Sequence, residues 1–217
     1  MNSRADILGR VRERIGRNEE NAVASRRDID DWLGARHQGP RPDTNGDLLA
    51  RFKAKSEALA TTVDIVEEWS AVPAAVARYL GANGLPTQAV GWPLIAGHRW
   101  TEAGIAFEGR GAVDADLVGI TGAYCAVAET GTLMLLSGAD TPASVSLLPE
   151  THVAVLAASR IVAGLEEAWD LARTELGGLP RAVNFISGPS RTGDIEQTIV
   201  LGAHGPYRVH VVAVTRA

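Results

Sequence analysis

The sequence predicts an α/β fold: a mostly parallel sheet flanked by helices, with an N-terminal helical extension. From residue 61 onward, short β-branched runs alternate with amphipathic helical segments, which favours parallel strands joined by helical crossovers. Several of these runs, such as TLMLLSG and HVAVLA, are continuously apolar, as expected for strands buried on both faces. Aromatic residues make up only 5% of the 217 residues, so Ala, Val, Leu and Gly must supply most of the packing.

The chain is expected to divide into a helical extension (1–60) and a main domain (61–217). The segment SRADILGRVRERIG (3–16) predicts a helix because Ile7, Leu8, Val11 and Ile15 recur at helical spacing. Residues 18–46 are polar and contain two prolines, so an irregular stretch is expected there. A second helix is predicted over 47–60. Both helices are expected to provide packing or to dock another subunit.

The main domain is predicted to contain eight strands and two long helices. The expected strands are TTVDIV (61–66), TQAVGW (87–92), GIAFEG (104–109), LVGITGA (117–123), TLMLLSG (132–138), HVAVLA (152–157), AVNFISG (182–188) and YRVHVVAV (207–214). The expected helices are VPAAVARYLGANG (72–84) and GLEEAWDLARTEL (164–176).

Composition excludes several classes of function. A formal net charge of −5 argues against nucleic-acid binding. The single cysteine, Cys125, permits no intramolecular disulfide and cannot build an iron–sulfur or zinc site alone, and we interpret it as a small buried hydrophobe rather than a reactive thiol. No secretory signal and no apolar run of about 20 residues is visible, so a cytoplasmic protein without a membrane span is expected.

The first candidate site segment is GITGAYCAVAETGTLMLLSG (119–138). Glu129 stands beside a buried run, where a carboxylate is costly unless it is paired, hydrogen-bonded or used in catalysis. Thr130 and Thr132 supply hydroxyls, and Gly131 permits close approach of a ligand or a sharp turn. Glu129 is therefore a candidate acid or base. The alternative, a carboxylate satisfied by neighbouring backbone N–H groups, stays open.

The second candidate segment is SGPSRTGDIEQT (187–198), in which a strand ends and a helix is expected to begin near Asp194. Small residues, hydroxyls and one arginine at a helix N-terminus favour an anion site. The candidate residues for binding the substrate or an anion are Gly188, Ser190, Arg191, Thr192 and Asp194 here, together with Thr130, Gly131 and Thr132 of the first segment. In the alternative, the hydroxyls cap the helix and Arg191 pairs with a nearby carboxylate. No Walker or dinucleotide-binding motif is present.

The third candidate segment is LGAHGP (201–206), where His204 lies in a glycine- and proline-rich turn. A histidine there can act in catalysis, although a plain turn residue is the simpler interpretation. The spacing of the histidines does not favour a metal site. Arg160, after another strand, either reaches the same edge or pairs with Glu166 or Glu167.

We expect Glu129, Arg191 and His204 to converge at one edge of the sheet, because ligands of open α/β sheets bind beyond the carboxyl ends of the strands.

These three segments, with SLLPETHVAVLAASRIV (146–162) between the first two, resemble the LUD domain family over residues 114–214. The resemblance implies a fold like that of the ribose-5-phosphate isomerase, glucosamine-phosphate deaminase and CoA-transferase superfamily. It also implies a role beside iron–sulfur partner subunits in oxidising L-lactate to pyruvate, with no cofactor bound by this chain. The segment Glu129-Thr130-Gly131 looks like the Glu-Asn-Gly segment of CoA transferases but lacks the Asn, so that chemistry is not carried over. A stand-alone enzyme acting on a sugar phosphate or acyl-CoA, and a non-catalytic assembly subunit, remain alternatives.

Overall fold

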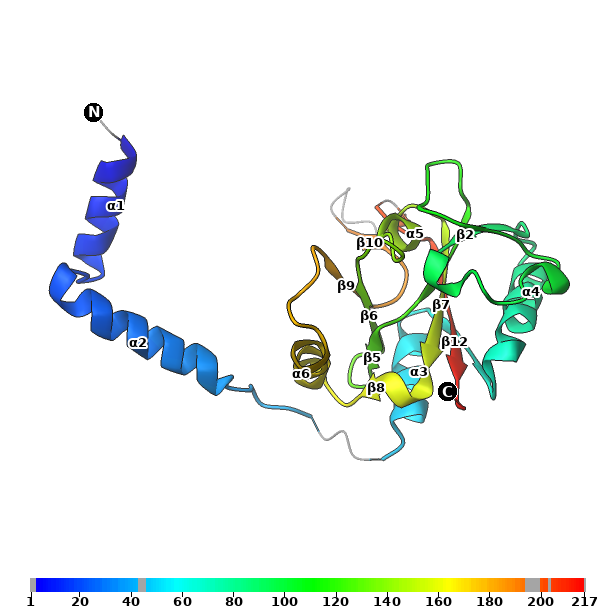
Figure 1. Ribbon diagram of the computed structural model, residues 1–217, viewed down its shortest axis with the longest axis horizontal. Coiled ribbons are helices and arrows are strands. Elements are labelled where there is room, and N and C mark those ends of the chain that lie inside the picture. Colours follow the sequence, from blue (N-terminus) through cyan, green and yellow to red (C-terminus); the bar gives the residue numbers. More distant parts are fainter. Residues whose placement is uncertain (1–2, 43–45, 194–199, 203, 217) are drawn as a thin grey trace. The chain divides into compact units, whose positions relative to one another are not determined.

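A computed structural model describes residues 3–42, 46–193, 200–202 and 204–216 (Figure 1). The chain forms two compact units, Met1–Pro42 and Asp43–Ala217. The predicted boundary after residue 60 differs from this division, because helix α3 (Leu48–Ala58) belongs to the second unit. Its Phe52 is fully buried in the main core. The described residues contain no helix long and apolar enough to cross a membrane.

The first unit consists of helices α1 (Ser3–Arg14) and α2 (Glu19–Ala35). The expectation of an irregular stretch over 18–46 is therefore wrong for α2. Asn18 begins this helix with a capping box: its side-chain oxygen accepts a hydrogen bond from the Asn21 backbone N–H, and the Asn21 side chain accepts one from Asn18 N–H, each over 2.9 Å. The polar composition concealed the helix, because the usual Glu or Gln of a capping box is replaced by Asn21.

The second unit is built on a mostly parallel sheet, as predicted. In the described part of the chain this large sheet has six strands, and every pair in it is parallel. Their spatial order is β1 (Thr62–Val66), β12 (Arg208–Val214), β7 (Thr151–Ala157), β4 (Val118–Gly122), β2 (Gln88–Gly91) and β3 (Ala106–Gly109). Residues that precede these strands lie at its amino end, and residues that follow them lie at its carboxyl end.

A second, small sheet was not predicted. Its order is β8 (Ile161–Val162), β5 (Cys125–Val127), β6 (Thr132–Leu136) and β9 (Val183–Ile186), and β6 runs antiparallel to both of its neighbours. The strands expected over 132–138 and 182–188 form, but in this sheet rather than the parallel one. An apolar run in the sequence indicates that a strand is buried, but it does not indicate which sheet the strand joins. A short hairpin pairs β10 (Arg191–Thr192) with β11 (Val200–Leu201).

Helices cover both faces of the large sheet. On one face, the Tyr79 ring of α4 (Val72–Ala82) stacks on His210 of β12, with centroids 3.9 Å apart. On the other face, the Val145 carbonyl of α5 (Ser144–Leu147) lies so close to Gly119 that a Cβ there would be 2.1 Å from it. Helix α6 (Leu165–Glu175) packs on the small sheet, where Ala168 and Ala172 join a second apolar cluster with Cys125. The alternation of strand and helix thus produces the expected buried core.

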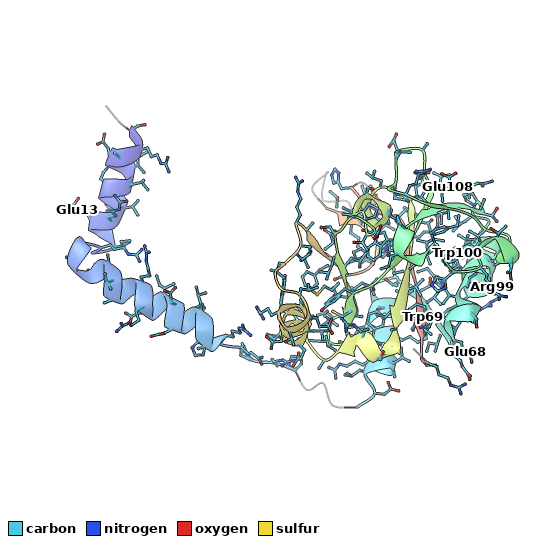
Figure 2. The ribbon with its side chains drawn as sticks, viewed as in Figure 1. Glu13, Glu68, Trp69, Arg99, Trp100 and Glu108 are labelled. Carbon is cyan, nitrogen blue, oxygen red and sulfur yellow. The ribbon has the colours of Figure 1, made fainter. Side chains whose placement is uncertain are left out.

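Trp69 and Trp100 lie on the same side of the domain (Figure 2) and belong to a series of contacting aromatic rings. Trp69 stacks on His98, the His98 ring meets Trp100 edge-on, and Trp100 stacks on Phe107 of β3, with centroid separations of 5.8, 5.8 and 5.1 Å. Although aromatic residues are scarce, several of them are concentrated here, where they pack against edge strand β3.

Candidate functional site

Two of the predicted site segments meet through their hydroxyl groups. The Thr132 Oγ1 atom lies 2.7 Å from Ser187 Oγ and 2.7 Å from Thr130 Oγ1. The contact arises because Thr132 begins β6 and Ser187 follows the neighbouring antiparallel strand β9. We call Thr130, Thr132 and Ser187 the hydroxyl network.

Gly131 and Gly188, on either side of this network, pack against the C-terminal part of α3. Gly131 has φ of 67°, and a Cβ built on it would lie 2.4 Å from Ser56 N; Ser56 Oγ also donates to the Gly131 carbonyl over 3.2 Å. Gly188 has φ of 80°, and its Cβ would lie 2.5 Å from the Leu59 carbonyl oxygen. Gly131 was expected to permit the approach of a ligand or a sharp turn, and Gly188 was expected to bind an anion. In the structure both permit close packing of backbone on backbone.

The loop from Gly188 to Thr192 is joined to the segment that precedes β12. Ser190 N–H donates to the Pro206 carbonyl and Gly202 N–H donates to the Ser190 carbonyl, each over 2.9 Å. Arg191 is exposed, and its Nη2 donates to the Leu59 carbonyl over 3.2 Å. Thr192 pairs with Val200 in the hairpin. The predicted residue Asp194 lies outside the described residues.

These loops lie at the amino end of the large sheet. Leu59 precedes β1 and Pro206 precedes β12. His204 also precedes β12, so its expected position at the carboxyl ends of the parallel strands is wrong. The rule for carboxyl ends holds within one parallel sheet, whereas the loop that carries Arg191 follows β9, which pairs antiparallel with β6 in the small sheet.

Glu129 is half-buried in the turn between β5 and β6, and its backbone N–H donates to the Ala163 carbonyl over 3.0 Å. Among the described residues, its carboxylate has no hydrogen-bond or ion-pair partner. The same turn carries Thr130 of the hydroxyl network. Glu129 does not line the groove, described next, that His204 lines.

A groove of about 630 Å³ opens at the amino end of the large sheet, and we call it the amino-end groove. It is lined by Leu147, Leu148, Glu150, Leu201, Gly202, His204, Gly205, Tyr207 and Arg208. The Arg208 guanidinium carbon lies 4.8 Å from the centroid of the Tyr207 ring. Arg208 was missed in the sequence, where its only distinguishing feature is that it starts a buried strand after the Gly205-Pro206 turn.

A second groove, of about 530 Å³, lies at the carboxyl end of the large sheet, where sequence reasoning had placed the site. We call it the carboxyl-end groove. It is lined by Trp92, Leu94, Gly122, Ala123, Tyr124, Leu136, Ser137, Thr141, Arg160, Glu175, Leu176, Gly178 and Pro180.

The polar wall of the carboxyl-end groove is an internally satisfied cluster. Arg160 binds both carboxylate oxygens of Glu175, over 2.6 and 2.8 Å, and donates from Nε to the Tyr124 carbonyl over 2.9 Å. The Tyr124 hydroxyl donates to Glu175 over 2.7 Å. The hydrogen bonds from Arg160, then that from Tyr124, lower the pKa of Glu175 to about 2. Arg160 therefore reaches this edge, and its carboxylate partner here is Glu175.

In the part of the chain that the structure describes, three titratable side chains are buried in the core: Cys125, His152 and His210. Burial raises the pKa of Cys125 to about 11, and the thiol lies 3.6 Å from the Met134 sulfur. Burial lowers the pKa of His152 and of His210 to about 4 each. Each ring has one hydrogen bond, to Thr121 and Thr62 respectively, over 2.8 Å. Within the described ranges, no three or more His, Cys, Asp or Glu residues are grouped so as to hold a metal ion.

The chain is similar in sequence and in fold to known proteins. The chain is 26% identical to lactate utilization protein C of Bacillus licheniformis, in an alignment covering 99% of this chain and 97% of that protein. It is 40% identical to the protein of the same name from Bacillus subtilis over 101 residues, or 45% of this chain and 42% of that protein. A crystal structure of a DUF162 family protein from Deinococcus radiodurans has the same fold, with a TM-score of 0.61 and 24% identity over 80% of this chain and 99% of that chain. The model of the LUD domain matches residues 49–214, and the chain belongs to the LUD domain family.

Proposed function

We propose that this protein is a subunit of a bacterial system that oxidises L-lactate to pyruvate. The observation that carries the proposal is the alignment with lactate utilization protein C over nearly the whole length of both chains. That alignment includes the N-terminal unit, which lies outside the match to the LUD domain model.

We place a small organic anion in the amino-end groove. Arg208 and His204 line it, and Arg191 lies in the adjoining hairpin, joined to the groove by the Arg191–Leu201 pairing. A guanidinium group recognises a carboxylate by paired hydrogen bonds, and a histidine can accept the proton of a 2-hydroxyl group. We assign the carboxylate to Arg208 and Arg191 and the hydroxyl to His204. Glu129, in the turn of the hydroxyl network, stays a predicted acid or base.

Oxidation of lactate to pyruvate releases two electrons and two protons, so it needs an electron acceptor. The one cysteine of this chain is buried, and its high pKa disfavours the thiolate that a metal requires. The residues of this chain therefore do not fit an iron–sulfur cluster, and we propose that partner subunits carry the clusters and accept the electrons. The purified chain should be colourless, with an iron content far below one atom per chain by elemental analysis; stoichiometric iron would contradict this assignment.

Growth on L-lactate tests the proposed function. Deleting the gene in its host should abolish growth on L-lactate but not on pyruvate, and the wild-type gene should restore it. Undiminished growth on L-lactate would overturn the proposal. Co-purification from this host should also recover iron–sulfur proteins with the tagged chain. If growth is lost and the partners are recovered, but isothermal calorimetry detects no binding of lactate or pyruvate, the assembly-subunit alternative replaces the anion site.

A further inference from the structure

We propose that the N-terminal unit pairs with the same unit of a second copy of the chain, with α1 of each copy packed on α2 of the other. The inference is independent of the proposed function, because it rests only on the two helices of residues 3–35. It would make the protein a symmetric dimer held by an exchanged pair of helical arms.

The first observation is that α1 and α2 expose an apolar surface. None of the described residues of α1 is buried. The relative exposure of Ile15 is 61%, that of Trp32 is 63% and that of Leu33 is 59%. The other exposed apolar side chains of this unit are Ile7, Leu8, Val11, Val23 and Ile29. Exposed apolar side chains gathered on one small unit favour an interaction site there.

The spacing of these residues gives each helix an apolar stripe. In α1, Leu8 and Val11 are three positions apart and Ile15, just beyond the helix, continues the series. In α2, Ile29, Trp32 and Leu33 follow the i, i+3, i+4 pattern. A helix with one such stripe gains stability chiefly by covering it.

The charges beside the two stripes are opposite. Helix α1 contains four arginines and two acidic residues, whereas α2 contains five acidic residues and two arginines. Arg4 and Arg12 lie one turn to either side of Leu8, while Asp28 and Asp30 precede Trp32 and Leu33 by four and three residues. Packing α1 on α2 brings arginines beside aspartates, and packing α1 on α1 brings arginines together.

The two helices of one chain do not cover each other in this way. Only the residues from Ile15 to Asn18 separate them. A hollow is lined by the connecting residues Ile15–Arg17 and by α2 residues that include Asn21 and Ile29, and both isoleucines stay exposed there. A second copy supplies the complementary helix to both stripes at once, which is the arrangement that two-fold symmetry produces.

Charge reversal in the full-length chain tests the pairing by sedimentation velocity. The wild type should be a dimer at micromolar concentration. The variant Arg4→Glu/Arg12→Glu and the variant Asp28→Arg/Asp30→Arg should each weaken dimerisation at least tenfold. An equimolar mixture of the two should dimerise again, because each helix then meets the opposite charge. The control Arg99→Glu reverses a charge of the second unit and should not change dimerisation.

A monomeric wild type overturns the proposal. So does a dimer that both variants leave intact, or a mixture that fails to re-form the dimer. Circular dichroism should show equal helix content in all variants, so that loss of the dimer is not loss of the helices. Growth on L-lactate can succeed or fail independently of these outcomes, which keeps the pairing distinct from the proposed function.

Discussion

Arg191 donates a hydrogen bond from Nη2 to the carbonyl oxygen of Leu59, over 3.2 Å. The same carbonyl lies against Gly188, three residues earlier in the loop. Leu59 directly follows α3, so the loop after β9 is fastened to the end of that helix at two points. This bond occupies one of the five N–H donors of the guanidinium, and the exposed remainder of the group is available for an anion.

Replacing Arg191 by Ala should weaken binding of lactate or pyruvate by about 1.5–3 kcal/mol, or roughly 10- to 150-fold in Kd, the range for a hydrogen bond to a charged group. Arg208→Ala should have an effect in the same range. The melting temperature should change little for Arg191→Ala, because its hydrogen bond is solvent-exposed. Calorimetric titration measures the affinity, with Arg99→Ala as the control. Normal affinity with a markedly lowered melting temperature would make Arg191 a purely structural residue.

Gly131→Ala should destabilise the fold by at least about 2 kcal/mol, because φ at this position is positive and the new Cβ would lie 2.4 Å from Ser56 N. Urea unfolding measures the loss. The matched control is Gly193→Ala, whose Cβ has no heavy atom within 4 Å. If the two variants have equal stability, the close packing of the Gly131 turn on α3 is not present in solution.

The free energy of unfolding should fall as the pH is lowered from about 6.5 to about 4. His152 and His210 have folded pKa values lowered to about 4 by burial, against about 6.5 in the unfolded chain. The unfolded state therefore binds more protons in this window, and each histidine removes up to about 3 kcal/mol of stability across it. Above pH 6.5 this stability is fully present.

Urea unfolding at several pH values checks the histidine effect. His152→Gln should reduce the slope of stability against pH, although it lowers stability overall. The control His37→Gln changes an exposed histidine and should leave the slope unchanged. A wild-type stability that is constant between pH 6.5 and 4 would contradict the burial of both histidines.

Cys125 should be inert toward a thiol reagent in the native protein. Its side chain is fully buried, and a pKa raised from 9.0 to about 11 lowers the thiolate fraction at neutral pH about 100-fold before access is considered. Spectrophotometric titration should count one thiol per chain only after denaturant is added. Rapid modification under native conditions would place Cys125 at the surface instead.

Local sequence patterns predicted most of the elements of the second unit. The runs at 61–66, 152–157 and 207–214 form the parallel strands expected of them, because β-branched residues suit a pleated, buried environment. The predicted site segments that contain Thr132 and Ser187 do meet, at 2.7 Å. Helix α2 escaped prediction because Asn21 replaces the usual Glu or Gln of its capping box, and because its apolar stripe is confined to the end of an otherwise polar sequence.

The periodicity of the sequence predicted the α/β class, and the motifs in their order carried the resemblance to the family, because both are recorded residue by residue along the chain. The tertiary structure alone decided which strands share a sheet. TLMLL and AVNFI join the small mixed sheet rather than the parallel one, and the loop after β9 that carries Arg191 lies beside the segment before β12, at the amino end of the large sheet. The tertiary structure also brings together Arg160 and Glu175, which are 15 positions apart in the sequence, at the carboxyl end of the large sheet. Strand partnership depends on contacts between distant segments, and an apolar run is equally suited to either sheet.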